Sequence, residues 1–262
     1  MADEASGSLS SDWPEFVRRV RARTPARLLV GRAGGAYRTG TQLDLRDAHA
    51  AARDAVRPEL DLERDLGAVF VEHWKLFEVS SRASSKDEYL LRPDLGRTFS
   101  DQSREEVKRR CPPGQQLQIA IGDGLSVTAV SAQVPGLLPL LYEGAQARGW
   151  TVGQTFVIRY CRVGILNEIG ELLTPEVAVL LIGERPGLAT AESLSAYLAY
   201  RPQRSHSDAN RNLISNIHVR GVRPEDAAVR SLHFVERMMK LGASGYDIRE
   251  ELPPAGLPII GQ

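Results

Sequence analysis

Apolar residues along this chain fall into short unbroken runs, separated by longer stretches in which they recur at helical spacing. The clearest run covers residues 177–182, six apolar side chains in a row, and it is typical of a strand buried on both faces. Similar runs predict strands at 117–121 and 156–160, and weaker ones predict strands at 193–200 and 211–218. Strands that alternate with helical stretches predict an α/β fold with a doubly wound, mainly parallel sheet.

Helical spacing, capping residues and proline or glycine stops predict the remaining elements. Pro135 and Pro139 are expected to break or restart the helix in which they lie, because proline removes a backbone N–H from the helix interior. Residues 86–97 are expected to be extended and to end in a turn. The other predicted elements are helices at 41–56 and 60–75, a short strand at 76–79, a helix capped by Ser100 or Ser103 that runs to about Arg110, a helix that runs to about Arg148, and helices at 168–173 and 224–241.

The three strongest predicted strands all end in polar or glycine-rich loops. These loops are residues 122–126, 161–163 and 183–188. The carboxyl ends of parallel strands meet at one edge of a sheet, and open α/β sheets bind their ligands there. That edge is therefore the predicted binding face, and the loop at 183–188 is expected to touch a cofactor.

Two acidic residues in these loops have more than one interpretation. Asp123, between two glycines, acts either as a general base or as a loop cap, and the loop cap is the commoner role. Glu184 either contacts a ligand or forms an ion pair with Arg185 or Arg162. The residue types alone leave both choices open.

The sequence contains no recognisable catalytic motif. GxSxG, HExxH and Walker sequences are absent, and no two histidines stand at metal-ligand spacing. Glu168 and Glu171 are expected to lie on the solvated face of a short helix. The residues by themselves therefore support a binding fold, and one hypothesis is a stand-alone Rossmann-like protein that binds a nucleotide or a small ligand, although GxGxxG is absent.

Composition and charge exclude several classes of protein. Lys and Arg total 33, as do Asp and Glu, and this balance argues against a dedicated nucleic-acid binder. The two cysteines, Cys111 and Cys161, are far apart and form no CxxC, so reduced thiols are expected. No apolar segment reaches the length of a membrane span, and the N-terminus lacks the apolar core of a signal peptide. These features predict a cytoplasmic protein.

The N-terminal part differs in composition from the rest. Residues 1–12 are small and polar and are expected to be disordered. Residues 16–43 contain seven arginines and no acidic residue, which indicates either a solvated basic face or a surface for an acidic partner or a phosphate. The glycine-rich residues 31–35 within this run form an anion-binding loop or a plain turn. We predict a mostly helical, partner-contacting region at 1–98 and a ligand-binding domain at 99–262.

Eight short motifs occur in a fixed order between residues 28 and 245. They are Gly31-Arg32-Ala33-Gly34, Arg92-Pro93-Asp94-Leu95-Gly96-Arg97, Asp123-Gly124-Leu125-Ser126, Arg159-Tyr160 with Arg162-Val163, Ile169-Gly170-Glu171, Gly183-Glu184-Arg185-Pro186-Gly187-Leu188, Ser193-Leu194-Ser195 and Ile214-Ser215-Asn216-Ile217-His218. One such motif is a weak signal, but eight in order are highly specific. Through them the chain resembles the small (light) subunit of ethanolamine ammonia-lyase.

This resemblance implies a subunit of an adenosylcobalamin-dependent lyase that converts ethanolamine to acetaldehyde and ammonia by a radical mechanism. It implies a hetero-oligomer in which a large TIM-barrel subunit holds the substrate, while the Rossmann-like domain at 99–262 helps to bind the cobalamin. Catalytic residues are then expected in the other chain and none in this one, because the cofactor carries the chemistry. An alternative is a purely structural partner that docks the large subunit through its basic N-terminal run.

By the same resemblance, the cobalamin contacts fall at Val163, Glu184 and Leu213. A valine can pack on a corrin face, and a carboxylate can accept hydrogen bonds from the amide side chains of the corrin. Position 213 departs from the family, which commonly has cysteine there. A backbone contact would survive that change, whereas a thiol contact would not.

His49 is not expected to bind the cobalt. Asp47-Ala48-His49 is close to the DxHxxG pattern by which some cobalamin proteins supply a histidine to the metal, but the glycine is absent and the context is a predicted helix. The family also keeps the dimethylbenzimidazole of the cofactor on cobalt, so no metal ligand is expected in this chain. Some relatives carry a longer N-terminal extension that is used for packaging into a bacterial microcompartment. This chain begins close to the shared region, so packaging is left open.

Overall fold

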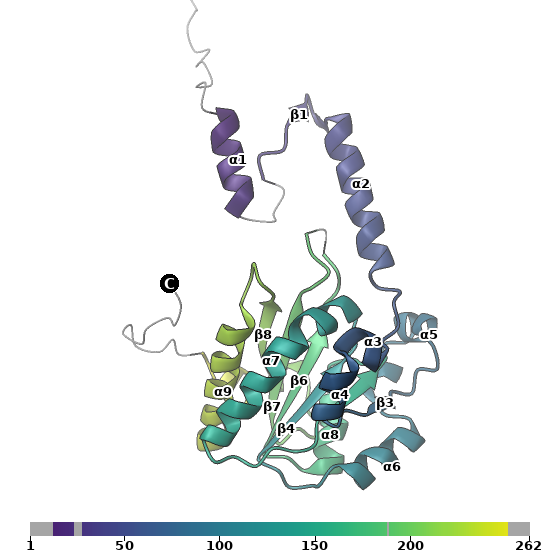
Figure 1. The fold of residues 1–262 in the computed structure, drawn as a ribbon, viewed down its shortest axis with the longest axis vertical. Helices are drawn as coiled ribbons and strands as arrows, with labels where there is room; N and C mark the ends of the chain where they lie inside the picture. Colours follow the sequence, from purple (N-terminus) through teal and green to yellow (C-terminus); the bar gives the residue numbers. More distant parts are fainter. Residues whose placement is uncertain (1–12, 24–27, 188, 251–262) are drawn as a thin grey trace, which may run out of the picture.

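A computed structural model of the chain describes residues 13–23, 28–187 and 189–250. In this part of the chain a six-stranded sheet has the order β3-β5-β4-β6-β7-β8 (Figure 1). The strands are β3 (Glu78–Ser80), β4 (Leu117–Gly122), β5 (Phe156–Arg159), β6 (Val177–Gly183), β7 (Leu194–Tyr200) and β8 (Asn212–Ile217). β3, β5, β4 and β6 run parallel, and β7 and β8 are antiparallel to their neighbours. The predicted α/β class and mostly parallel sheet are confirmed.

Two hydrophobic layers cover the sheet, one on each face. Along β6, Val177, Val179 and Leu181 belong to one apolar cluster, and Ala178 and Leu180 belong to the other. Successive side chains of a strand point to opposite faces, so an unbroken apolar run is what a strand between two layers requires. Every residue of β6 is buried, which confirms the interpretation of residues 177–182.

The helices that cover the two faces come from different parts of the chain. α7 (Val127–Ala147) and α9 (Pro224–Leu241) contribute to the first cluster, whereas α6 (Asp101–Arg110) and α8 (Ile165–Leu173) contribute to the second. α9 has the predicted bounds, with a proline at its first position and a left-handed Gly242 at its C-cap. α8 begins three residues before the prediction. Ser100 caps α6 by accepting a hydrogen bond from the Ser103 N–H.

α7 corrects the prediction that Pro135 and Pro139 interrupt their helix. The helix continues through both prolines for 21 residues. Pro135 and Pro139 are four positions apart and share one face, away from the buried residues. Packing of the opposite face on the sheet and on α9 therefore offsets the lost backbone hydrogen bonds.

Two further segments differ from their predictions. Residues 60–75 form two short helices, α3 (Leu62–Leu66) and α4 (Ala68–His73), which are separated by Gly67 at φ +86°. Residues 86–97, expected to be extended, begin with the helix α5 (Lys86–Leu91) and end in a 3-10 turn, Leu95–Arg97. The Ser85 side chain caps α5 by accepting a hydrogen bond from the Glu88 N–H.

The N-terminal elements lie apart from the sheet (Figure 1). They are α1 (Trp13–Arg23), the strands β1 (Arg32–Ala33) and β2 (Ala36–Tyr37), and α2 (Thr39–Asp54), which no buried residue anchors. The glycine-rich residues 31–35 thus include a turn between two short strands. Residues 1–12, for which disorder was predicted, lie outside the described residues. β3 also comes from the region before residue 99, and the division at that point stays a prediction.

Two predictions about chemistry and membranes can be compared with the fold. Cys111 and Cys161 are both free and buried, as expected for reduced thiols. Burial raises the pKa of the Cys111 thiol to about 12 and that of the Cys161 thiol well above its ordinary value. No helix among the described residues combines the length and the apolar character needed to cross a membrane.

Candidate functional site

β4, β5 and β6 end at the same edge of the sheet, as predicted from their loops. A cavity of about 270 Å³ opens at this edge, and we call it the strand-end cavity. Val163, Glu184 and Leu213 all line it, although they come from the β5–α8 turn, the end of β6 and the strand β8. The structure therefore brings together all three residues that the sequence predicts as cofactor contacts.

Val163 and Leu213 give the strand-end cavity apolar surface. Val163 is half-buried and packs against the apolar cluster beneath α8. Leu213 is 44% exposed, because its neighbour Ile214 points into the core and alternation along β8 turns Leu213 outward. An exposed leucine beside a cavity offers apolar surface that a ligand could contact.

Glu184 is held by three donors at the edge of the sheet. Its carboxylate accepts hydrogen bonds from the Ser193 hydroxyl at 2.5 Å, the Ser195 hydroxyl at 2.6 Å and the Asn216 N–H at 2.9 Å. The partners of Glu184 are thus two hydroxyls and a backbone amide, and the alternative of an ion pair with Arg185 or Arg162 is not formed. A carboxylate has about four acceptor positions, so roughly one remains for a ligand donor.

Asp123 is a loop cap. It is fully buried and accepts hydrogen bonds from the Tyr160 and Cys161 N–H groups, each at 2.9 Å. These bonds fix the end of β5, where Tyr160 has a φ of +55°. Burial raises the pKa of Asp123, and the nearby Lys86 ammonium and the backbone donors oppose that rise. The general-base alternative finds no support, because the carboxyl group reaches no open surface.

Two glycines explain how closely the β4 and β6 loops approach each other. A Cβ atom on Gly124, which has a φ of +58°, would lie 2.2 Å from the Gly183 carbonyl oxygen. A Cβ on Gly183 would lie 2.0 Å from the Ser126 carbonyl oxygen. Both glycines are therefore required by the close contact between the two loops, and both line the strand-end cavity.

Sequence reasoning did not predict Tyr89 as a residue of the strand-end cavity, and it considered Arg162 only as an ion-pair partner of Glu184. The Tyr89 hydroxyl donates to the Cys161 carbonyl at 2.9 Å, and the Arg162 guanidinium lies 4.3 Å from the centre of the Tyr89 ring. Burial raises the pKa of Tyr89. The available signal was the pair Ser85 and Glu88, which has the spacing of a capping box and would have placed Tyr89 on a helix.

Glu168 and His49 lie in contrasting environments. Glu168, predicted to be solvated, is 7% exposed, and its carboxylate accepts hydrogen bonds from the Phe99 N–H and from Arg104. His49 is exposed on α2 and lines none of the cavities described here. Among the described residues no group of three or more His, Cys, Asp or Glu side chains has the arrangement of a metal site.

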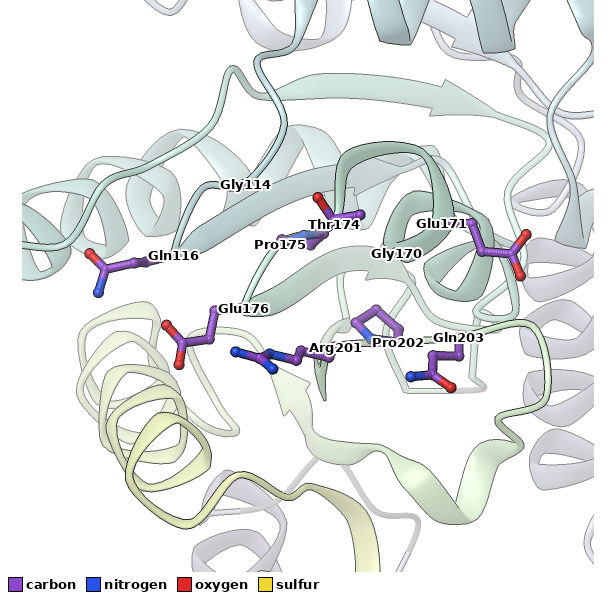
Figure 2. Close-up of a pocket in the computed structure, with 10 residues that line it drawn as sticks. All are labelled: Gly114, Gln116, Gly170, Glu171, Thr174, Pro175, Glu176, Arg201, Pro202 and Gln203. Atoms are coloured by element: carbon purple, nitrogen blue, oxygen red, sulfur yellow. The ribbon is translucent and has the colours of Figure 1, made fainter.

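A second hollow, of about 460 Å³, lies at the opposite edge of the sheet (Figure 2). Gln116 and Glu176 precede β4 and β6, and Arg201 follows β7, so this hollow lies at the amino ends of the parallel strands. None of the predicted cofactor contacts lines it. Ligands of open α/β sheets bind at the other edge, so no cofactor contact is expected in this hollow.

Comparison with known proteins gives a consistent result. Residues 14–249 match the family described as ethanolamine ammonia-lyase light chain (EutC). The ethanolamine ammonia-lyase small subunit of Clostridium perfringens is 41% identical over 230 residues, which cover 88% of this chain and 76% of that protein. The one of Fusobacterium nucleatum is 41% identical over 90% of this chain and 77% of its own length.

The match also holds for a relative that is aligned with this chain over almost its whole length. The ethanolamine ammonia-lyase small subunit of Clostridium acetobutylicum is 38% identical over 235 residues, or 90% of this chain and 95% of that protein. The matched residues include the whole sheet and every residue of the strand-end cavity. This chain belongs to the family of ethanolamine ammonia-lyase light chains.

Proposed function

We propose that this chain is the cofactor-binding small subunit of an ethanolamine ammonia-lyase, which converts ethanolamine to acetaldehyde and ammonia with adenosylcobalamin. One observation carries the proposal: Val163, Glu184 and Leu213 line a single cavity at the carboxyl edge of the sheet. Open α/β sheets bind their ligands at this edge. The family membership names the reaction, and the geometry supports these three residues as the contacts.

The residues of the strand-end cavity fit part of a cobalamin. Val163 and Leu213 offer apolar contact, and Glu184 keeps an acceptor position for an amide N–H of the corrin. A cavity of about 270 Å³ is smaller than many sites for drug-sized ligands, and cobalamin is larger still. This chain therefore covers one side of the cofactor, and a second protein must cover the rest.

The chain's own part in the reaction is to bind, orient and shield. When bound, adenosylcobalamin supplies the radical chemistry, so the protein does not need a nucleophile or a general base at this cavity. Asp123 is buried as a loop cap, and Glu184 is hydrogen-bonded on both oxygens. These residues hold the site in place, and the substrate is expected in the large TIM-barrel subunit.

The remaining predictions belong to this proposal. A Rossmann-like, doubly wound arrangement is supported by helices on both faces of the parallel strands. The region at 1–98 is proposed to contact the large subunit, because α2 has no buried residue of its own. A cytoplasmic location is proposed, inside or outside a bacterial microcompartment.

Co-expression tests the proposed function. The chain is expressed with and without a candidate large subunit, and acetaldehyde formed from ethanolamine is measured in the presence of adenosylcobalamin. We expect activity only when both chains are present. Activity from this chain alone, or none from the pair when the large subunit is active with another small subunit, would overturn the proposal.

A further inference from the structure

Another cavity, different from the hollow at the opposite edge of the sheet, adjoins the strand-end cavity on the other side of the turn at residues 162–164. Its volume is about 550 Å³, and Arg162 and Val163 line both cavities. Four arginines reach it from different parts of the chain, and we call it the arginine cavity. They are Arg97, Arg162, Arg204 and Arg211.

The arginine cavity carries more positive than negative charge. Three carboxylates also line it, and each has an arginine partner: Glu168 pairs with Arg104, Glu171 with Arg204 and Asp208 with Arg211. Arg97 and Arg162 have no carboxylate partner among the described residues. Two uncompensated guanidinium groups therefore face one cavity, and an anion is the ligand that would balance them.

Buried donors without partners point to the same conclusion. The Arg211 side chain is only 4% exposed, and its Nε has no hydrogen-bond partner within the described part of the chain. The same holds there for Arg162 Nε, and His206 Nδ1, which is a donor or an acceptor according to the tautomer, also lacks a partner there; both residues line the same cavity. A buried donor without an acceptor is costly, so donors of this kind are expected where a ligand supplies the acceptor.

The amino end of α8 adds a further attraction for anions. α8 begins at this cavity after its N-cap residue, Gly164, and its first three N–H groups donate to the backbone carbonyls of residues 162–164, so this end offers the partial positive charge of the helix and not first-turn donors. The Arg97 side chain lies directly over Gly164, so that a Cβ there would come within 2.9 Å of Arg97 Cγ. The partial positive charge of a helix amino end and a guanidinium group thus act at the same place.

We infer that the arginine cavity binds a phosphate group, which Arg97, Arg162 and Arg211 hold at the amino end of α8. Guanidinium groups bind phosphate through paired hydrogen bonds, and a phosphate offers more acceptor oxygens than a carboxylate does. Free phosphate and the phosphodiester in the nucleotide tail of a cobalamin share this chemistry. The second source rests on the proposed function, because the tail would have to reach over Arg162 from the strand-end cavity.

Binding measurements with two corrinoids and inorganic phosphate distinguish the two sources. The complex with the large subunit is titrated with adenosylcobalamin and with adenosylcobinamide, which lacks the nucleotide tail and its phosphate, and bound corrinoid is measured by its visible absorption. The full chain is titrated with inorganic phosphate by calorimetry. The variants are Arg97→Gln and Arg162→Gln, and Arg109→Gln, an exposed arginine on α6 outside the cavity, is the control.

If the tail is the source, we expect Arg97→Gln to weaken cobalamin binding about tenfold, with cobinamide binding unchanged. If free phosphate is the source, the chain binds inorganic phosphate, and Arg97→Gln weakens that binding by a similar factor without affecting either corrinoid. In both cases Arg109→Gln behaves like the unmodified chain. Arg162→Gln is also expected to weaken binding of the phosphate group, but Arg162 lines the strand-end cavity as well, so only Arg97→Gln tests whether binding of the corrin itself stays unchanged.

The inference fails if the unmodified chain binds no inorganic phosphate and neither variant alters the preference for cobalamin over cobinamide. Failure of the proposed function gives a different pattern, because the complex would then bind neither corrinoid. In that case, phosphate binding that depends on Arg97 would still support a phosphate site in the arginine cavity. If the chain then bound no phosphate, the phosphate site would be overturned too. Unfolding curves show whether each variant keeps the native fold.

Discussion

The carboxyl edge of the sheet and the N-terminal arm, which consists of residues 13–23 and 28–54, differ in how their residues are anchored. At the edge, Asp123 and Glu184 accept five hydrogen bonds from three segments of the chain. In the arm, α2 contains no buried residue, and Leu43 is 53% exposed. A helix of this length is only marginally stable alone in water. The edge is therefore held in place by the chain's own hydrogen bonds, whereas the arm leaves its residues exposed, which is what the proposed contact with a large subunit would require.

The largest expected effect tests whether the edge is as rigid as its glycines indicate. Gly183→Ala places a Cβ 2.0 Å from the Ser126 carbonyl oxygen, so the β4 and β6 loops must separate. We expect a loss of about 3 kcal/mol in the free energy of unfolding, measured by urea denaturation of the full chain. Gly40→Ala, on α2, is the control. The added Cβ meets open space, so this substitution should be neutral or should raise the unfolding free energy by about 0.5–1 kcal/mol. Equal changes in unfolding free energy for Gly183→Ala and Gly40→Ala would contradict the conclusion that the edge is more tightly packed than the arm.

The next effect concerns the buried loop cap. Asp123→Asn leaves one acceptor oxygen for two backbone donors, and it removes the negative charge near the buried Lys86. We expect a loss of about 1–3 kcal/mol in unfolding free energy. Adding Lys86→Met should recover part of that loss, which a double-mutant cycle measures. Additive losses in the double variant would show that Asp123 and Lys86 do not interact.

Glu184 should affect both stability and cofactor binding. Glu184→Ala leaves the Ser193 and Ser195 hydroxyls and the Asn216 N–H without their acceptor, and we expect a loss of about 1–2 kcal/mol. In the assembled complex the same change should weaken cobalamin binding about tenfold, measured by absorption titration, with assembly intact. Gln203→Ala, in the hollow at the opposite edge, should leave cofactor binding unchanged. An unaltered affinity in Glu184→Ala would argue against a cofactor contact.

The smallest effect on stability is expected in the arm. Leu43→Asp replaces a side chain that the chain itself leaves exposed, so the unfolding free energy should change by less than about 0.5 kcal/mol. Association with the large subunit should nevertheless weaken, because the substitution removes an apolar contact that Leu43 would make in the assembled complex. Sedimentation of the mixed subunits measures this change. Normal association would show that this part of α2 faces solvent in the complex.

The prediction of individual elements succeeded where local signals were strong and failed where distant residues decided. α9 carries a proline start and a glycine stop, and its predicted bounds agree with the structure. α7 continues through Pro135 and Pro139 because its packing on the sheet and α9 outweighs a local signal. α5 is a different case, because Ser85 and Glu88 are a local signal for the start of a helix, although residues 86–97 were expected to be extended.

The candidate site shows the same division. The positions of Val163, Glu184 and Leu213 followed from motifs and strand ends, and the structure brings them to one cavity. The partners of Glu184 could not be predicted, since Ser195 and Asn216 approach it only through the pairing of β7 and β8 with β6. The burial of Glu168 depends on Arg104 and Phe99, which are more than sixty positions away in the chain.

The sequence by itself determined the buried strand at 177–182, the glycine-rich loop that follows it and the family to which the chain belongs, because periodicity, turn residues and motifs are local properties. Only the tertiary structure decided what these residues touch. Packing made Gly183 a contact between two loops, gave Glu184 three donors and left Arg97 and Arg162 without carboxylate partners among the described residues. The burial and the charge environment of a side chain depend on neighbours that are distant in the sequence and that only the fold brings together, so no local pattern predicts them.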